Sequence, residues 1–165
     1  MRTIDEARRW STPHEAYTSG PDFTHFPTVD QIDINPDGAY VHFCYNETVN
    51  AVEQPLTPEL IEKFGGQPII GDMSSCILSM PVDVSKYGVI YAGAQKNAGP
   101  AGTTIVIVRD DLLNQKRADC PSMLDWKLFA DTNSLYNTPP CFGMYKMGLY
   151  FDYMKRNGGV DAFYN

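Results

Sequence analysis

The sequence has few of the residues that build metal centres, and it lacks long hydrophobic runs. Histidine occurs three times and cysteine four times in 165 residues, and the cysteines are widely separated, with no C-x-x-C pair. We therefore expect no metal site and free, buried thiols. No apolar run approaches the roughly 20 residues that span a bilayer, and Met1 to Glu6 lack the apolar core of a signal peptide. These absences predict a cytoplasmic protein.

Basic residues are also in the minority. Lys and Arg total 13 against 20 Asp and Glu, which gives a net charge of -7. A chain with this balance repels a phosphate backbone, so nucleic acid is not an expected partner. Hydrophobic residues make up 43% of the chain, which is ordinary for a folded protein, and the length suits one domain over residues 1–165.

Short apolar runs separated by turn residues indicate a sheet. We expect strands covered on both faces at 40–44, 68–72, 89–92 and 104–108. Between the first two, Thr57 can cap a helix that has Pro58 in its first turn and that ends at Gly65 and Gly66. Strands that alternate with helices predict an α/β fold, a layered α/β/α arrangement with a mostly parallel central sheet.

Other segments give weaker signals. Residues 4–10 resemble the end of a helix, and the prolines that follow predict an extended loop. Residues 110–115 predict one or two helical turns, and 124–130 a strand or an irregular connection. A final helix is expected from a capping Thr138 to Gly158, and its apolar residues at helical spacing are expected in the core. These are Phe142, Tyr145, Leu149 and Tyr153.

The glycine-rich segment 93–102 presents a single lysine, Lys96, directly after an expected strand. Its amine can act as a nucleophile, because conversion to an imine removes the cost of deprotonation. The alternative is an ordinary solvated loop lysine. Asp72 ends another expected strand, and α/β sheets bind ligands at the carboxyl ends of their strands. By itself, Asp72 could equally be a turn or cap residue.

Several motifs resemble those of the phosphoserine aminotransferases from Asp5 onward. They lie at 40–48, 72–75, 81–88, 93–102, 104–109 and 134–140. The resemblance implies a class V, fold type I aminotransferase that binds pyridoxal 5'-phosphate. That family transfers the amino group of glutamate to 3-phosphohydroxypyruvate, giving O-phosphoserine and 2-oxoglutarate in serine biosynthesis.

The resemblance also implies roles for particular residues. Lys96 matches the lysine that bonds to the cofactor aldehyde and moves the proton, and Asp72 matches the carboxylate that pairs with the pyridine nitrogen. Thr48 matches a threonine near the ring oxygen, and Gln95 a residue that contacts the cofactor phosphate. Lys96 and Asp72 are thus the expected catalytic residues.

Asn137 and Thr138 resemble a pair that reaches the cofactor phosphate of the neighbouring subunit in a homodimer. Helix capping would explain Thr138 equally well. The resemblance further implies that the amino-terminal part of the large domain and the small carboxyl-terminal domain lie outside this chain, so that it is inactive alone. Two alternatives are a non-catalytic relative that forms dimers and another fold type I aminotransferase.

Overall fold

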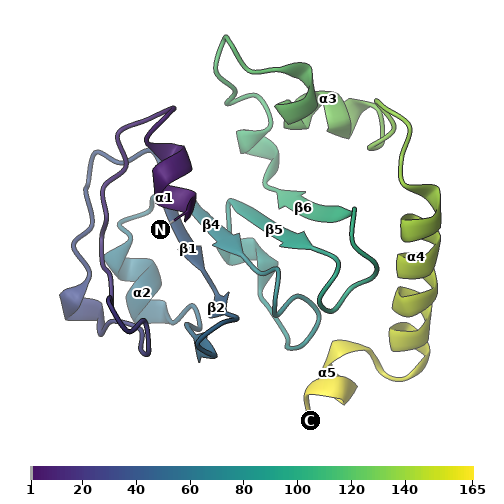
Figure 1. Cartoon of the computed structure of the whole chain (residues 1–165), viewed down its shortest axis with the longest axis horizontal. Coiled ribbons are helices and arrows are strands. Elements are labelled where there is room, and N and C mark those ends of the chain that lie inside the picture. The colour runs from purple at the N-terminus through teal and green to yellow at the C-terminus, as the bar shows by residue number, and fades with distance from the viewer. Residues whose placement is uncertain (1) are drawn as a thin grey trace.

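A four-stranded sheet forms the centre of the molecule. The computed structural model describes residues 2–165, and its strands lie in the order β1-β4-β5-β6 (Figure 1). The first three are parallel, and β6 is antiparallel to β5. Their bounds are Val41–Cys44 for β1, Ile69–Asp72 for β4, Val89–Gly93 for β5 and Thr104–Val108 for β6. The expected α/β fold with a mostly parallel sheet is confirmed.

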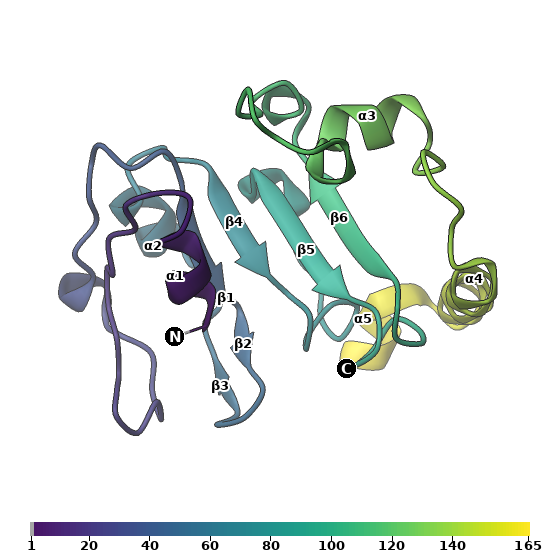
Figure 2. The ribbon, with the colours of Figure 1, turned by 45° about the horizontal axis from the view of Figure 1, so that its top comes forward.

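Helices lie near both edge strands of this sheet. In both ribbon views α1 and α2 lie near β1, whereas α3 and α4 lie beyond β6 (Figures 1 and 2). A small hairpin, β2 and β3, follows β1. The helices are α1 Arg2–Ala7, α2 Pro58–Lys63, α3 Trp126–Asp131, α4 Cys141–Arg156 and α5 Gly159–Tyr164; the hairpin strands are Asn46–Glu47 and Val52–Glu53. Short 3-10 turns occupy Val29–Gln31, Val84–Lys86, Asp110–Leu112 and Ser122–Leu124.

Helix α2 has the boundaries that its sequence predicts. Thr57 Oγ1 accepts a hydrogen bond from the Leu60 amide at 3.3 Å, which satisfies one of the unpaired donors of the first turn. After the helix, Gly65 and Gly66 have φ values of +62° and +83°. Glycine adopts this left-handed region without steric cost, so the chain can turn toward β4.

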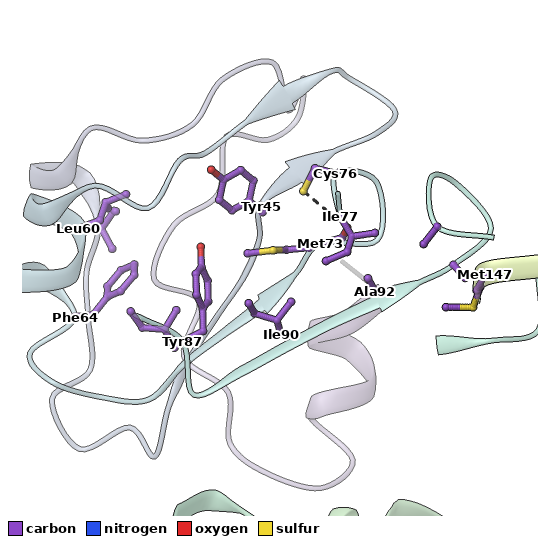
Figure 3. Packing of buried hydrophobic residues seen from close by; sticks show 14 residues of the cluster. Tyr45, Leu60, Phe64, Met73, Cys76, Ile77, Tyr87, Ile90, Ala92 and Met147 are labelled. Atoms are coloured by element: carbon purple, nitrogen blue, oxygen red, sulfur yellow. Dashed lines mark hydrogen bonds between the residues drawn. The ribbon is translucent and has the colours of Figure 1, made fainter. Parts of the chain in front are cut away.

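The hydrophobic core lies on one face of the sheet. Ile90 and Met73 are each only 1% exposed, and they pack with Phe64 and Tyr87 (Figure 3). The rings of Phe43 and Phe64 lie 6.3 Å apart between centroids. In β4 the residues that face this core are buried and the alternate ones are partly exposed. The sheet therefore has one buried and one half-open face.

The expectation that every strand is covered on both faces is wrong for β6. Val106 and Ile107 point to opposite faces and remain 43% and 41% exposed. The strand lies at the edge of the sheet, and within residues 2–165 it pairs only with β5. An apolar run identifies a strand, but the number of layers packed on it depends on tertiary structure.

Two segments differ from the expected secondary structure. The strand or irregular connection expected at 124–130 is wrong, because α3 forms there. Its cap is Asp125, which accepts hydrogen bonds from the amides of Lys127 and Leu128. The first helix ends at Ala7 and not at Trp10.

Helix α4 begins later than expected. Pro140 occupies the capping position and no side chain caps the helix, so the prediction that Thr138 starts it is wrong. A proline at that position still suits the helix start, because its missing N–H is not needed there.

The apolar stripe of α4 is exposed, contrary to its expected place in the core. Phe142, Tyr145 and Tyr153 are 73%, 63% and 55% exposed, and Leu149 is also largely exposed. The buried side consists of Gly143, Met147 and Met154. Helical spacing identified the helix, but the buried face was set by contact with the Lys96 turn. No helix within residues 2–165 is long and apolar enough to cross a membrane.

Candidate functional site

Lys96 lies in a tight turn after β5. Its neighbours Ala94 and Ala98 are fully buried, and the amides of Ala98 and Gly99 both donate to the Ala94 carbonyl at 2.9 Å. The Lys96 side chain itself is exposed, and its Nζ donates to Thr48 Oγ1 at 2.5 Å. A rigid turn thus presents the amine, and the β2–β3 hairpin holds it. Lys96 and Thr48 are thus in direct contact, and their roles at a cofactor stay predictions.

Asp72 is the last residue of β4, the strand next to β5. Its Oδ1 accepts hydrogen bonds from the Ser74 amide at 3.0 Å and from Ser74 Oγ at 2.6 Å. Ser74 Oγ also accepts from the Gly93 amide at 3.2 Å, which connects Asp72 to the strand end that leads into Lys96. Asp72 therefore organises a turn and also points a carboxylate toward the carboxyl edge of the sheet.

The electrostatics of Cys44 connect Asp72 with Lys96. Burial raises the pKa of the Cys44 thiol to about 11, and the negative charges of Asp72 and Glu47 add to the rise. The positive charge of Lys96 opposes it, so both Asp72 and Lys96 act on one thiol. Cys44 is consequently a neutral thiol at pH 7.

The four cysteines are free but not uniformly buried. Cys76 is buried, Cys44 and Cys120 are partly exposed, and Cys141 is exposed at the start of α4. The expectation of buried thiols is therefore wrong for Cys141. Residues 2–165 contain no group of three His, Cys, Asp or Glu side chains placed to hold a metal ion.

Gln95 folds back on the end of β5. A Cβ on Gly93 would lie only 2.6 Å from Gln95 Oε1, so this amide packs directly against the glycine backbone. Asn137 and Thr138 are exposed in the connection between α3 and α4, where Asn137 Nδ2 donates to the Thr138 carbonyl at 3.4 Å. Within the described residues no hydrogen bond joins this pair to Lys96 or Asp72.

A groove of about 550 Å³ separates the Lys96 turn from α4. Lys146 and Tyr150 line it from the helix, and sequence reasoning did not identify either residue as part of the site. The available signal was their spacing of four, which places them on one side of a helix. The lining residues are Lys96, Asn97, Gly99, Pro100, Phe142, Lys146, Leu149 and Tyr150.

The arrangement suits a particular chemistry. An amine can form an imine with an aldehyde, and a fixed carboxylate can pair with a protonated heterocycle nitrogen. Lys96 and Asp72 provide these groups at one edge of the sheet, and Thr48 adds a hydroxyl.

A family model described as aminotransferase class-V matches residues 24–165. The chain belongs to the class-V aminotransferase family. Among curated relatives, the phosphoserine aminotransferase of Herminiimonas arsenicoxydans is 51% identical over 163 residues, which cover 98% of this chain and 44% of the relative. That of Burkholderia multivorans is 48% identical over 164 residues, with the same shares of the two chains. The chain thus spans less than half the length of these relatives.

Solved structures give the same result. The phosphoserine aminotransferase of Bacillus circulans subsp. alkalophilus is 37% identical with a TM-score of 0.90, and the match covers 99% of this chain and 44% of that one. The pyridoxal-phosphate-bound phosphoserine aminotransferase of Trichomonas vaginalis is 33% identical with a TM-score of 0.86, covering 99% and 48%. The predicted resemblance and the aminotransferase fold are confirmed.

Proposed function

We propose that this chain carries the cofactor-binding lysine and carboxylate of a phosphoserine aminotransferase. The reaction is transfer of the glutamate amino group to 3-phosphohydroxypyruvate, giving O-phosphoserine and 2-oxoglutarate as a step of serine biosynthesis in the cytoplasm. The observation that carries the proposal is the Lys96 Nζ to Thr48 Oγ1 contact at the end of β5, one strand from Asp72. The similarity to phosphoserine aminotransferases supports the choice of substrates.

The residues present fit pyridoxal 5'-phosphate. The donor set consists of an exposed amine, a partly buried carboxylate and a hydroxyl. When bound, the cofactor supplies an electron sink for the pair released when the substrate C–H bond breaks. All other tasks fall to the protein.

With the cofactor bound, Lys96 would hold its aldehyde, and once the substrate amine has displaced the Lys96 amine, that free amine would carry the proton at the substrate carbon. The hydrogen bond to Thr48 restricts where Nζ can lie. This restraint supports catalysis, because a proton-transfer group must be within about 3 Å of the atom that it serves.

Asp72 would pair with the ring nitrogen of the bound cofactor and keep it protonated, which would strengthen the electron sink. A carboxylate has room for about four hydrogen bonds. Ser74 occupies two of them at Oδ1, so the group is fixed and still has capacity for a cationic N–H.

We assign the remaining contacts to Gln95, Asn137 and Thr138. Gln95 contacts the cofactor phosphate from beside the lysine. Asn137 and Thr138 reach the phosphate of the neighbouring subunit in a homodimer, and the exposure of both residues supports this role. The chain alone has very weak or no turnover, because groups that orient the substrate supply much of the transition-state stabilisation.

Titration with pyridoxal phosphate tests the lysine assignment. We expect a yellow absorbance band for the wild-type chain, which is lost in Lys96→Ala. Lys146→Ala is the matched control, because Lys146 lines the same groove and has no assigned role. A band that survives in Lys96→Ala, or that disappears only in Lys146→Ala, contradicts the proposal.

The exposed α4 stripe favours a second candidate, a non-catalytic protein that acts through dimer contacts. Four large apolar side chains of one helix are exposed together. Apolar residues scattered singly over a surface need no partner, whereas a contiguous group of them is typical of a protein–protein contact. Light scattering combined with the absorbance titration separates the two. A stable dimer without any cofactor band favours the second candidate.

A further inference from the structure

His42 and Tyr91 lie on the half-open face of the sheet, on either side of Asp72. In the register of the strands, Asp72 is opposite Tyr91 of β5, and His42 of β1 is opposite Ile70. Residues paired in this way point to the same face. His42, Asp72 and Tyr91 therefore share one face, on three adjacent strands.

The two outer residues meet across the middle strand. His42 Nε2 lies 2.9 Å from the Tyr91 hydroxyl, and the rings are stacked with centroids 5.9 Å apart and an interplanar angle of 22°. Strands lie about 4.8 Å apart, so the Tyr91 phenol has to cross β4 to reach β1. Ile70 and Asp72 are the β4 residues on this face that are paired with His42 and Tyr91, so the Tyr91 side chain passes over β4 beside them.

Both rings are electrically neutral near pH 7. Burial lowers the pKa of His42, although the Asp72 charge acts in the opposite direction. Burial also raises the pKa of Tyr91, and the adjacent Asp72 carboxylate raises it further. A neutral Tyr91 keeps its phenol hydrogen and can donate it to Asp72, which lies opposite it in the strand register.

The direction of these hydrogen bonds follows from the strength of the acceptors. A carboxylate is a stronger acceptor than a neutral imidazole nitrogen, so the phenol hydrogen favours Asp72. The Tyr91 oxygen is then left to accept from His42 Nε2–H. That arrangement requires the imidazole tautomer with its proton on Nε2, which the NMR titration below tests.

We infer that Tyr91, braced by His42, is a positioning residue that holds the Asp72 carboxylate in the orientation needed to face the cofactor ring nitrogen. The inference rests on the proposed function. Ser74 holds one side of the carboxylate from its own strand end. Tyr91 is opposite Asp72 on the neighbouring strand, where its hydroxyl is available to the other side of the carboxylate.

The other ionisable groups near this network are few within the described residues. Cys44 lies opposite Asp72 on β1 and is neutral, with its pKa raised to about 11. Glu47 and Lys96 act on Cys44 with opposite charges from the hairpin and from the turn. Among His42, Cys44, Asp72 and Tyr91, which share this face of the three strands, Asp72 is thus the one that carries a charge.

Amide hydrogen exchange in the cofactor-free chain tests the positioning role. The Ser74 amide donates to Asp72 Oδ1, so its exchange rate reports how firmly the carboxylate is held. We expect Tyr91→Phe to speed Ser74 exchange about tenfold relative to the core amide of Ile90. Tyr87→Phe is the matched control, because it removes a buried hydroxyl whose raised pKa owes nothing to Asp72. Equal Ser74 exchange in the two variants overturns the inference.

A second readout is the titration of His42 by NMR. Since the Asp72 charge raises the pKa of His42, Asp72→Asn is expected to lower that pKa further. The imidazole is expected as the Nε2–H tautomer in the wild-type chain. An unchanged His42 titration in Asp72→Asn, or the opposite tautomer, also overturns the inference.

A rescue experiment separates hydrogen bonding from packing. Gln retains an N–H donor at position 42, so His42→Gln is expected to keep Ser74 exchange near the wild-type rate, whereas His42→Leu is expected to speed it as Tyr91→Phe does. Equal effects of the two substitutions count against the relay. Failure of the wild-type chain to bind pyridoxal phosphate defeats the proposed function, and the exchange measurements still decide the role of Tyr91.

Discussion

The contact between α4 and the Lys96 turn gives a sharp test of the packing around the site. Gly143 is buried in the first turn of α4, where an added Cβ would lie 2.9 Å from Thr103 Oγ1 and 3.8 Å from Pro100 Cγ. Gly148 lies farther along the same helix, and nothing is within 4 Å of its Cβ position. The two glycines therefore differ in their surroundings but share a helix.

The expected magnitudes follow from two opposing effects. Ala in place of Gly in a helix interior stabilises by about 1 kcal/mol, so Gly148→Ala is expected to be more stable than the wild type by up to that amount. Gly143→Ala has a smaller gain near the helix end and an overpacking cost of about 1–3 kcal/mol. Thr103 Oγ1 is already a buried atom without a hydrogen-bond partner among residues 2–165. A shift of Thr103 away from the new methyl group therefore breaks no hydrogen bond, and it also forms none that would offset the overpacking cost.

Urea unfolding followed by circular dichroism measures the difference. With a slope of about 2 kcal/mol per molar urea, a 2 kcal/mol gap between the variants separates their midpoints by about 1 M. Gly143→Ala should also disturb the groove that contains Lys96, because it moves the helix that forms one wall. Equal midpoints for the two variants would refute the close packing of α4 on the turn.

Three further predictions concern capping, thiol reactivity and pH. Thr57→Ala removes the α2 cap and is expected to cost about 1 kcal/mol in urea unfolding. Cys44 has a pKa of about 11, so at pH 8 it is expected to react with iodoacetamide at least about 100-fold more slowly than exposed Cys141. The rate of Cys44 should rise about tenfold per pH unit. Equal rates for the two cysteines, measured by mass spectrometry, contradict this prediction. Lys116 and the amides of Leu128 and Lys127 hold the pKa of Asp125 below its usual range. The Asp125 carboxylate therefore stabilises the fold fully above its unfolded pKa of about 4. This stabilisation is lost as the pH falls through the lower pKa of the folded state. In Asp125→Asn the free energy of unfolding should therefore depend less on pH below about pH 4 than it does in the wild type.

Local sequence signals predicted the elements that depend on local interactions. The Thr57 cap and the two glycines after α2 act on their own backbone, so the helix they bound could be identified without a fold. The apolar runs of β1, β4 and β5 were also found where expected. Asp125 shows the limit, because its capping role was overlooked when an apolar segment suggested a strand.

The cofactor roles of the site residues stay predictions, and the contacts among these residues come from the structure. Lys96 and Thr48 are 48 residues apart and meet through Nζ and Oγ1. The motif resemblance assigned both to one cofactor site, but their direct contact depends on the tertiary structure. The His42 and Tyr91 pair was missed, since its 2.9 Å contact depends on the strand order β1-β4-β5. The hydrophobic pattern of each strand does not specify which other strands it will pair with.

The sequence by itself determined the four strands of the central sheet, the α2 helix and the glycine-rich turn that presents Lys96, because these depend on backbone preferences and hydrophobic period within a few residues. The β2–β3 hairpin was not predicted. The tertiary structure decided which side of α4 is buried and which side chains surround Asp72. Those outcomes depend on contacts between segments far apart in the chain, such as Gly99 against Met147, where shape complementarity and not local propensity selects the arrangement.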